Sequence, residues 1–110
     1  MYHTNSRIYQ TSMALVDDAR LVMDGLPAGF GFLKDQLRRA VSGIPLTFIE
    51  GCGRRSSCDR RRFFDMARSS AYEVCAILDV AERFRVVDPR LAAQARARID
   101  QLAGMLSKYR

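Results

Sequence analysis

The stretch QLRRAVSGIPLTFIEGCGRRS, residues 36–56, contains most of one amphipathic helix and the turn that leads to the next. Its apolar side chains recur every three or four residues, the spacing of one helix face, at Leu37, Val41, Ile44 and Phe48. The pattern stops at residues 51–53, where two glycines flank a cysteine and favour a turn. Pro45 lies inside the stripe. Because proline removes a backbone hydrogen bond and collides with the preceding turn, we expect this helix to bend near residues 41–44.

The same helical period continues on both sides of this stretch, and no segment alternates with the period of a strand. The pattern predicts four helices, at about residues 5–24, 30–50, 57–85 and 89–109. Asp88-Pro89 supplies an N-cap and a first-turn proline for the fourth helix, and Ser56 followed by Asp59 forms a weak capping box for the third. The short connections predict an all-α fold, an up-and-down antiparallel four-helix bundle. With 110 residues, 48% of them hydrophobic, the chain has room for a single core, and we expect one domain over residues 1–110.

The positive charge is concentrated in the middle of the chain. Between Lys34 and Arg62 there are eight basic and three acidic residues, which give +5 of the net +6. Three of the arginines, residues 60–62, fall in the first turns of the third predicted helix, where the macrodipole is already positive and each cation costs about 0.3–1 kcal/mol. Two explanations stay open: an anionic partner whose phosphates pair with arginine forks, or a solvated face of an arginine-rich protein. For an anionic partner, the candidate nucleic-acid-binding residues are Arg38, Arg54, Arg55, Arg61 and Arg62.

The remaining basic residues of this region have other expected roles. Arg39 stands four residues after Asp35, in the orientation that favours an ion pair within one helix. Arg60 follows the apolar stripe of Phe63 and Phe64, so we expect its aliphatic stem to cover the edge of the core. The stripe assigns both phenylalanines to the core, which leaves little support for base stacking.

The central stretch resembles the signature Q-x-R-R-A-x-x-S-I-P-x-N-I-A-E-G-x-G-R-x-S of four-helix-bundle proteins known as 23S rRNA intervening-sequence or S23 ribosomal proteins. Six downstream residues fall on that family's pattern D-x-x-R-F-x-x-x-A-x-x-S-x-x-E: Asp59, Arg62, Phe63, Ala67, Ser70 and Glu73. The resemblance covers residues 36–73, about a third of the chain. Five positions depart from the pattern and mark a divergent member: Gly43, Thr47, Phe48, Ile49 and Arg60.

The resemblance implies a four-helix protomer assembled into a homo-oligomeric ring, with a pentamer as the suspected size. The accessory protein of diversity-generating retroelements is similar to this family, so the resemblance also implies binding of RNA or DNA and of a reverse transcriptase. The alanine-rich fourth helix agrees with a ring, because a face of small residues can pack closely on a neighbour.

Five motif residues are interpreted as structural: Pro45, Glu50, Gly51, Gly53 and Glu73. Both glutamates are flanked by apolar residues, so each needs an arginine partner inside the bundle or at a subunit interface. The two glycines have two interpretations, an anion-binding nest before a helix or a simple turn between two helices, and the second is the commoner arrangement.

Catalysis, metal binding and membrane insertion are not expected. The chain has one histidine, His3, and three cysteines without a CxxC spacing, so zinc, a disulfide framework and a di-metal site are disfavoured and no cofactor is predicted. Ser69 and Ser70 have no histidine base in any core helix. We expect free and mostly buried thiols, with Cys52 the most reactive because of its glycine and arginine neighbours. The longest uncharged stretch is about half of a membrane span, and no signal peptide is apparent, so a cytoplasmic location is expected.

These observations predict a non-enzymatic, basic, oligomeric bundle that binds RNA or DNA through its arginines and acts as accessory to a nucleic-acid enzyme such as a reverse transcriptase. The alternative is an oligomeric adaptor between proteins, whose arginines contact an acidic surface and which has no nucleic-acid role.

Overall fold

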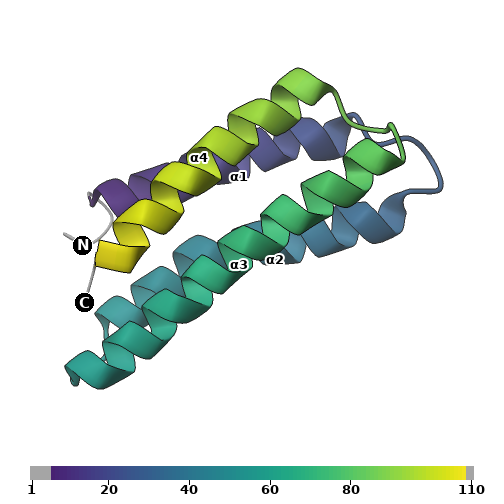
Figure 1. Ribbon diagram of the computed structural model, residues 1–110. Helices are drawn as coiled ribbons and strands as arrows, with labels where there is room; N and C mark the ends of the chain where they lie inside the picture. The colour runs from purple at the N-terminus through teal and green to yellow at the C-terminus, as the bar shows by residue number, and fades with distance from the viewer. Residues whose placement is uncertain (1–5, 109–110) are drawn as a thin grey trace.

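The computed structural model describes residues 6–108, which form four helices and no strand (Figure 1). The helices are α1 (Arg7–Asp24), α2 (Gly31–Cys52), α3 (Ser57–Arg83) and α4 (Pro89–Lys108). The predicted ranges are correct to within two residues wherever they can be compared, and the predicted outer limits, residues 5 and 109, lie outside the described residues. Helix α3 ends two residues early because Phe84 is its C-cap and Arg85 takes a left-handed conformation, with φ of 60°.

The helices form an antiparallel bundle in which each helix packs on two others. Helices α1 and α3 each pack against both α2 and α4, and the contact between α2 and α3 is the most extensive. The bundle measures 44 × 22 × 21 Å. The first turn of α1, the connection between α2 and α3 and the last turn of α4 lie at one end, here called the proximal end (Figure 1). The other two connections lie at the opposite, distal end, so the up-and-down arrangement is confirmed.

Side-chain caps define the beginnings of three helices. The Ser6 hydroxyl accepts a hydrogen bond from the Tyr9 amide at 3.1 Å, and the Ser56 hydroxyl accepts one from the Asp59 amide at 3.0 Å. The Asp88 carboxylate accepts from the Arg90 amide at 2.9 Å. Each such cap contributes about 0.5–2 kcal/mol. The predicted caps at positions 56 and 88 are therefore confirmed.

Helix α4 is attached to the bundle by polar contacts as well as by apolar packing. The carboxylate of Asp18 in α1 is 5% exposed and accepts hydrogen bonds from Gln94 at 3.1 Å and from Nε of Arg98 at 2.9 Å. On its other side, Arg96 forms ion pairs with Glu82 and with Asp79 of α3. The hydrogen bond that Arg98 donates to Asp18 raises the pKa of Arg98, and the hydrogen bond that Arg96 donates to Glu82 raises the pKa of Arg96.

Two expectations about the packing have different outcomes. Helix α2 continues through the buried Pro45, and the Ser42 hydroxyl donates to the Arg38 carbonyl oxygen one turn earlier; the bend near residues 41–44 stays a prediction. Ala92, Ala95 and Ala103 of α4 are buried in the chain's own core, so most of the small-residue face is used within the protomer.

Among residues 6–108, no helix is long and apolar enough to cross a membrane.

Candidate nucleic-acid interface

The turn between α2 and α3 brings most of the candidate arginines together at the proximal end. Gly51 is buried, and a Cβ atom there would lie 2.8 Å from Cβ of Phe63 and 2.9 Å from Cε1 of Phe64. Glycine therefore allows the end of α2 to approach α3 closely. The Gly53 amide donates to the carbonyl oxygens of Ile49 and Glu50, so this N–H group is already occupied. The glycines form a helix end, and the anion-nest interpretation is wrong.

Arg60 fixes the backbone of this turn. Its guanidinium Nη1 donates to the carbonyl oxygens of Arg54, at 2.9 Å, and Arg55, at 2.8 Å. The side chain is half-buried, as expected for a stem that covers the core edge, but its charged group serves the turn. Arg60 therefore holds the backbone at Arg54 and Arg55, two of the candidate nucleic-acid-binding residues.

Arg54 and Arg62 meet at the ring of Phe63. The guanidinium carbon of Arg54 lies 4.4 Å from the ring centroid, and that of Arg62 lies 5.1 Å from it. Each guanidinium also forms an ion pair within its own helix region, Arg54 with Glu50 at 2.9 Å and Arg62 with Asp59 at 3.1 Å. The two predicted residues thus belong to one ordered cluster on the α2 and α3 side of the bundle.

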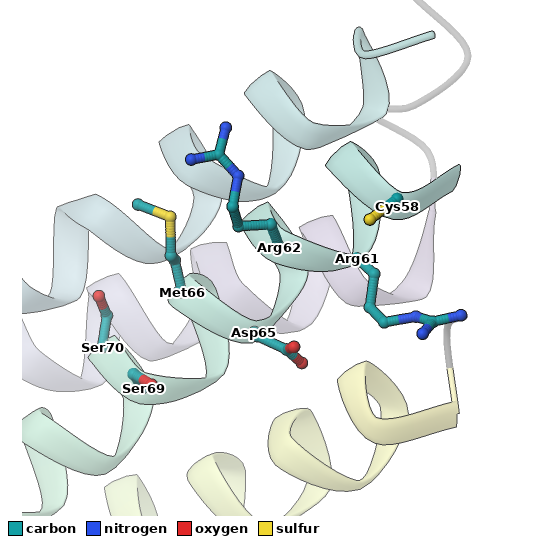
Figure 2. A pocket seen from close by; sticks show the side chains of 7 residues that line it. All are labelled: Cys58, Arg61, Arg62, Asp65, Met66, Ser69 and Ser70. Carbon is teal, nitrogen blue, oxygen red and sulfur yellow. The ribbon is translucent and has the colours of Figure 1, made fainter. Parts of the chain in front are cut away.

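Arg55 and Arg61 are exposed and form no ion pair with another described residue. Arg61 and Arg62 line an open hollow of about 600 Å³ on α3, together with Cys58, Asp65, Met66, Ser69 and Ser70. Figure 2 shows the two arginine side chains pointing away from each other, Arg62 toward α2 and Arg61 toward the end of α4. The first turns of α3 therefore present cations on both sides of the helix.

Arg38 is separated from the other four candidates. It precedes the last residue of α2 by 14 positions, which corresponds to about 21 Å along the helix axis. Its guanidinium pairs with Asp35 at 2.7 Å. The expected pair between Asp35 and Arg39 is wrong, because the Asp35 carboxylate pairs with Arg38 instead. Residues at i+3 and at i+4 are both neighbours of residue i on a helix surface.

The two motif glutamates are exposed in the protomer, so neither lies inside the bundle, and the alternative of a place at a subunit interface stays a prediction. Glu50 has the predicted arginine partner, Arg54, but at the surface. Glu73 forms no ion pair with any described residue, because its position on α3 faces solvent beside α2. Of their neighbours in the chain, Gly51 and Val74 are buried, whereas Tyr72 is exposed like Glu73 itself.

The cysteine expectations are corrected as well. None of the three thiols is fully buried: Cys58 is exposed, and Cys52 and Cys75 are half-buried. Burial raises the pKa of Cys52, and the positive charge of Arg60 opposes this only in part. The expectation that Cys52 is the most reactive thiol stays a prediction. His3 lies outside the described residues, and within residues 6–108 no group of three or more His, Cys, Asp or Glu side chains could hold a metal ion.

The fold gathers basic side chains from three separate stretches of the chain at the proximal end. Among the described residues, the proximal end (6–10, 50–65 and 104–108) has seven basic and three acidic side chains. The distal end (20–35 and 79–90) has five of each. Arg7 and Lys108 join the proximal group only because the helices are antiparallel, so the linear charge count missed them.

Two apolar surfaces were also missed by the sequence analysis. A groove of about 380 Å³ lies between α1 and α2, lined mainly by apolar side chains that include Met13, Pro45 and Leu46, and Leu46 is 69% exposed. At the distal end, the exposed rings of Phe32 and Phe84 lie with their centroids 6.4 Å apart. Both surfaces depend on which side of a helix faces solvent, and this depends on its neighbours.

A comparison with protein families matches the chain to the family described as 23S rRNA-intervening sequence protein. The match covers residues 4–108 and so includes all four helices and the whole signature stretch. No curated protein matches the chain.

Proposed function

Because the chain belongs to the 23S rRNA-intervening sequence protein family, we propose that it is a non-enzymatic bundle that binds RNA or DNA with its proximal end. The observation that carries this proposal is the charge polarity, seven basic against three acidic side chains at the proximal end and an even balance at the distal end. Phosphates are the partner that this surface fits. The residues proposed to contact them are Arg54, Arg55, Arg61 and Arg62.

Local energetics support an anionic partner. Arg61 and Arg62 lie in the second turn of α3, close to the helix end at which the dipole disfavours cations, so the dipole does not stabilise them in the free protein. A phosphate group near this helix end is stabilised by the same dipole. The pairs of Arg54 and Arg62 with exposed carboxylates are worth about 0–1 kcal/mol each, so phosphates can compete with them.

The family relation extends the proposal to assembly and context. We propose a homo-oligomeric ring, with a pentamer as the suspected size, which acts in the cytoplasm as an accessory to a nucleic-acid enzyme such as a reverse transcriptase. A ring would place the proximal ends of several protomers on one surface, so each nucleic-acid molecule would meet several arginine clusters and gain avidity. Light scattering at tens of micromolar tests this part, and a monomer would contradict it.

The direct test is fluorescence anisotropy of a labelled structured RNA and a matched DNA duplex, at low and at physiological salt. We compare the native protein with a variant in which the four proximal arginines (54, 55, 61 and 62) are alanine. The control variant replaces Lys34, Arg20, Arg83 and Arg90 at the distal end by alanine, so that both variants lose the same net charge. We expect steeply salt-dependent binding that is lost in the first variant and kept in the second. Equal losses would assign binding to overall charge, and salt-insensitive binding or none would refute the proposal.

The second candidate function is a protein adaptor, and the groove between α1 and α2 favours it. An exposed leucine at the edge of an apolar groove is typical of a surface that accepts side chains of a protein partner. Under this alternative the native protein binds neither nucleic acid. Leu46→Ser would then weaken a protein complex, whereas the proximal arginine variant would weaken it only through an acidic partner surface.

A further inference from the structure

The guanidiniums of Arg54 and Arg62 both lie against the ring of Phe63, a buried residue. Phe63 is 7% exposed, and its Cβ lies against Gly51. The ring therefore has little freedom to move. Because both guanidinium carbons lie within about 5 Å of one centroid, they lie within about 10 Å of each other, although they come from opposite sides of a turn.

This arrangement reduces the cost of binding. An arginine side chain has many rotamers, and part of this conformational entropy is lost when the side chain is fixed on a ligand. A guanidinium that already lies over an aromatic ring is stabilised there by the cation–π attraction and has fewer conformations to lose on binding. A guanidinium can keep its face on a ring while its N–H groups bind an oxyanion, so the ring contact survives an exchange of ligands.

The two carboxylates occupy the guanidiniums in the free protein. Glu50 and Asp59 are 56% and 40% exposed, so water and salt screen their attraction for Arg54 and Arg62. A nucleic-acid backbone brings several phosphates at once and releases counterions when it is neutralised. Phosphates can therefore displace the two carboxylates from the guanidiniums, whereas the buried ring of Phe63 stays in place.

We propose that Phe63 is a positioning residue that holds Arg54 and Arg62 as a preformed clamp for backbone phosphates, and that Glu50 and Asp59 compete with those phosphates for the clamp. This inference rests on the proposed function and assigns roles to three residues that bear no positive charge. It gives two opposite expectations: loss of the ring weakens binding, and loss of the carboxylates strengthens it.

The ring is tested with Phe63→Leu, Phe63→Tyr and the control Phe64→Leu. Phe64 is a neighbouring buried ring that packs against Phe48 with centroids 5.3 Å apart, so its truncation costs comparable core packing. With a labelled 20-base-pair RNA duplex, we expect F63L to weaken binding about five- to tenfold, and F64L and F63Y to stay within twofold of the native protein.

The carboxylates are tested with the double variant E50Q/D59N, in which both substituted side chains are at the surface. The control is D24N/D35N at the distal end, which changes the net charge equally. We expect E50Q/D59N to bind the duplex about three- to tenfold more tightly than the control variant. Weaker binding of E50Q/D59N would mean that the carboxylates orient the guanidiniums for phosphate, and would overturn the competition.

A spectroscopic measurement separates this inference from the proposed function. Arginine Nε–Hε signals are followed by nuclear magnetic resonance during titration with tripolyphosphate, and we expect those of Arg54 and Arg62 to shift in the native protein and not in F63L. If the native protein binds RNA but F63L behaves like F64L, the clamp is wrong and the proposed function stands. If RNA does not bind but tripolyphosphate shifts both signals, the clamp stands and the proposed function fails. The absence of both effects overturns both.

Discussion

Asp18 of α1 and Arg98 of α4 form the polar contact that joins the first and last helices, with Oδ2 and Nε 2.9 Å apart and the carboxylate 5% exposed. A buried carboxylate that loses its charged partner keeps its desolvation cost without compensation. The two residues are 80 positions apart, so the contact exists only when the bundle is closed. This pair therefore ties the stability of the protein to the docking of α4.

Arg98→Ala is expected to lower the free energy of unfolding by about 1–3 kcal/mol, because Gln94 alone remains to satisfy Asp18. The pKa of Arg98 is raised in the folded state, so its contribution is complete at every pH below its unfolded pKa and is lost only as the pH rises through the folded one. The destabilisation by R98A should consequently be constant between pH 6 and 9. Urea unfolding at several pH values measures it, and a destabilisation below about 0.5 kcal/mol would contradict the structural role.

Gly51→Ala is expected to destabilise the protein by about 1–3 kcal/mol, although alanine is the better helix former. The new methyl group would meet Phe63 and Phe64 at less than 3 Å and force α2 and α3 apart. Gly104→Ala is the matched control in α4, since no atom lies within 4 Å of the added Cβ. We expect this control to raise the melting temperature, by the equivalent of about 0.5–1 kcal/mol. Equal effects of both substitutions in thermal unfolding would refute the close approach.

The sequence predicts local features well because each depends on residues a few positions apart. The spacing of the apolar residues predicted the four helices, and Ser56 and Asp88 were predicted as the helix caps that the structure contains. The candidate site was found only in part. Arg7 and Lys108 join it because the helices are antiparallel, and a count of charges along the chain does not bring such distant positions together.

Contacts that depend on rotamers or on the phase of a helix were missed or mistaken. Asp35 has arginines at both i+3 and i+4, and spacing alone does not choose between them. The thiols were expected to be mostly buried, but Cys58 is exposed at the start of α3. The pairing of Asp18 with Arg98 needs the three-dimensional order of α1 and α4, which the charge pattern does not contain.

Alkylation should distinguish the three thiols in the order of their exposure. We expect iodoacetamide at pH 8 to modify Cys58 first, because it is exposed on the first turn of α3. Cys52 should react more slowly, since burial raises its pKa and so lowers the fraction of reactive thiolate at that pH. Raising the pH toward 10 should reduce the difference in alkylation rate between Cys58 and Cys52, because a larger fraction of Cys52 is then thiolate. Peptide mass mapping over time gives the rates, and faster modification of Cys52 than of Cys58 would restore the sequence-based expectation.

Arg60→Ala should weaken nucleic-acid binding even though the Arg60 guanidinium is bonded to the backbone of the turn. Without its hydrogen bonds to the carbonyl oxygens of Arg54 and Arg55, the turn gains freedom, and we expect affinity for the RNA duplex to fall about three- to tenfold. Arg38→Ala removes the same charge about 21 Å along α2 from the turn and should change affinity less than twofold. The salt dependence separates the two roles further. Alanine at Arg55 or Arg61 removes a phosphate contact and should reduce the magnitude of the slope of log K against log salt by about 0.7–0.9, whereas R60A should leave this slope nearly unchanged. A decrease of about 0.7–0.9 in the magnitude of the slope in R60A would instead make Arg60 a direct phosphate ligand.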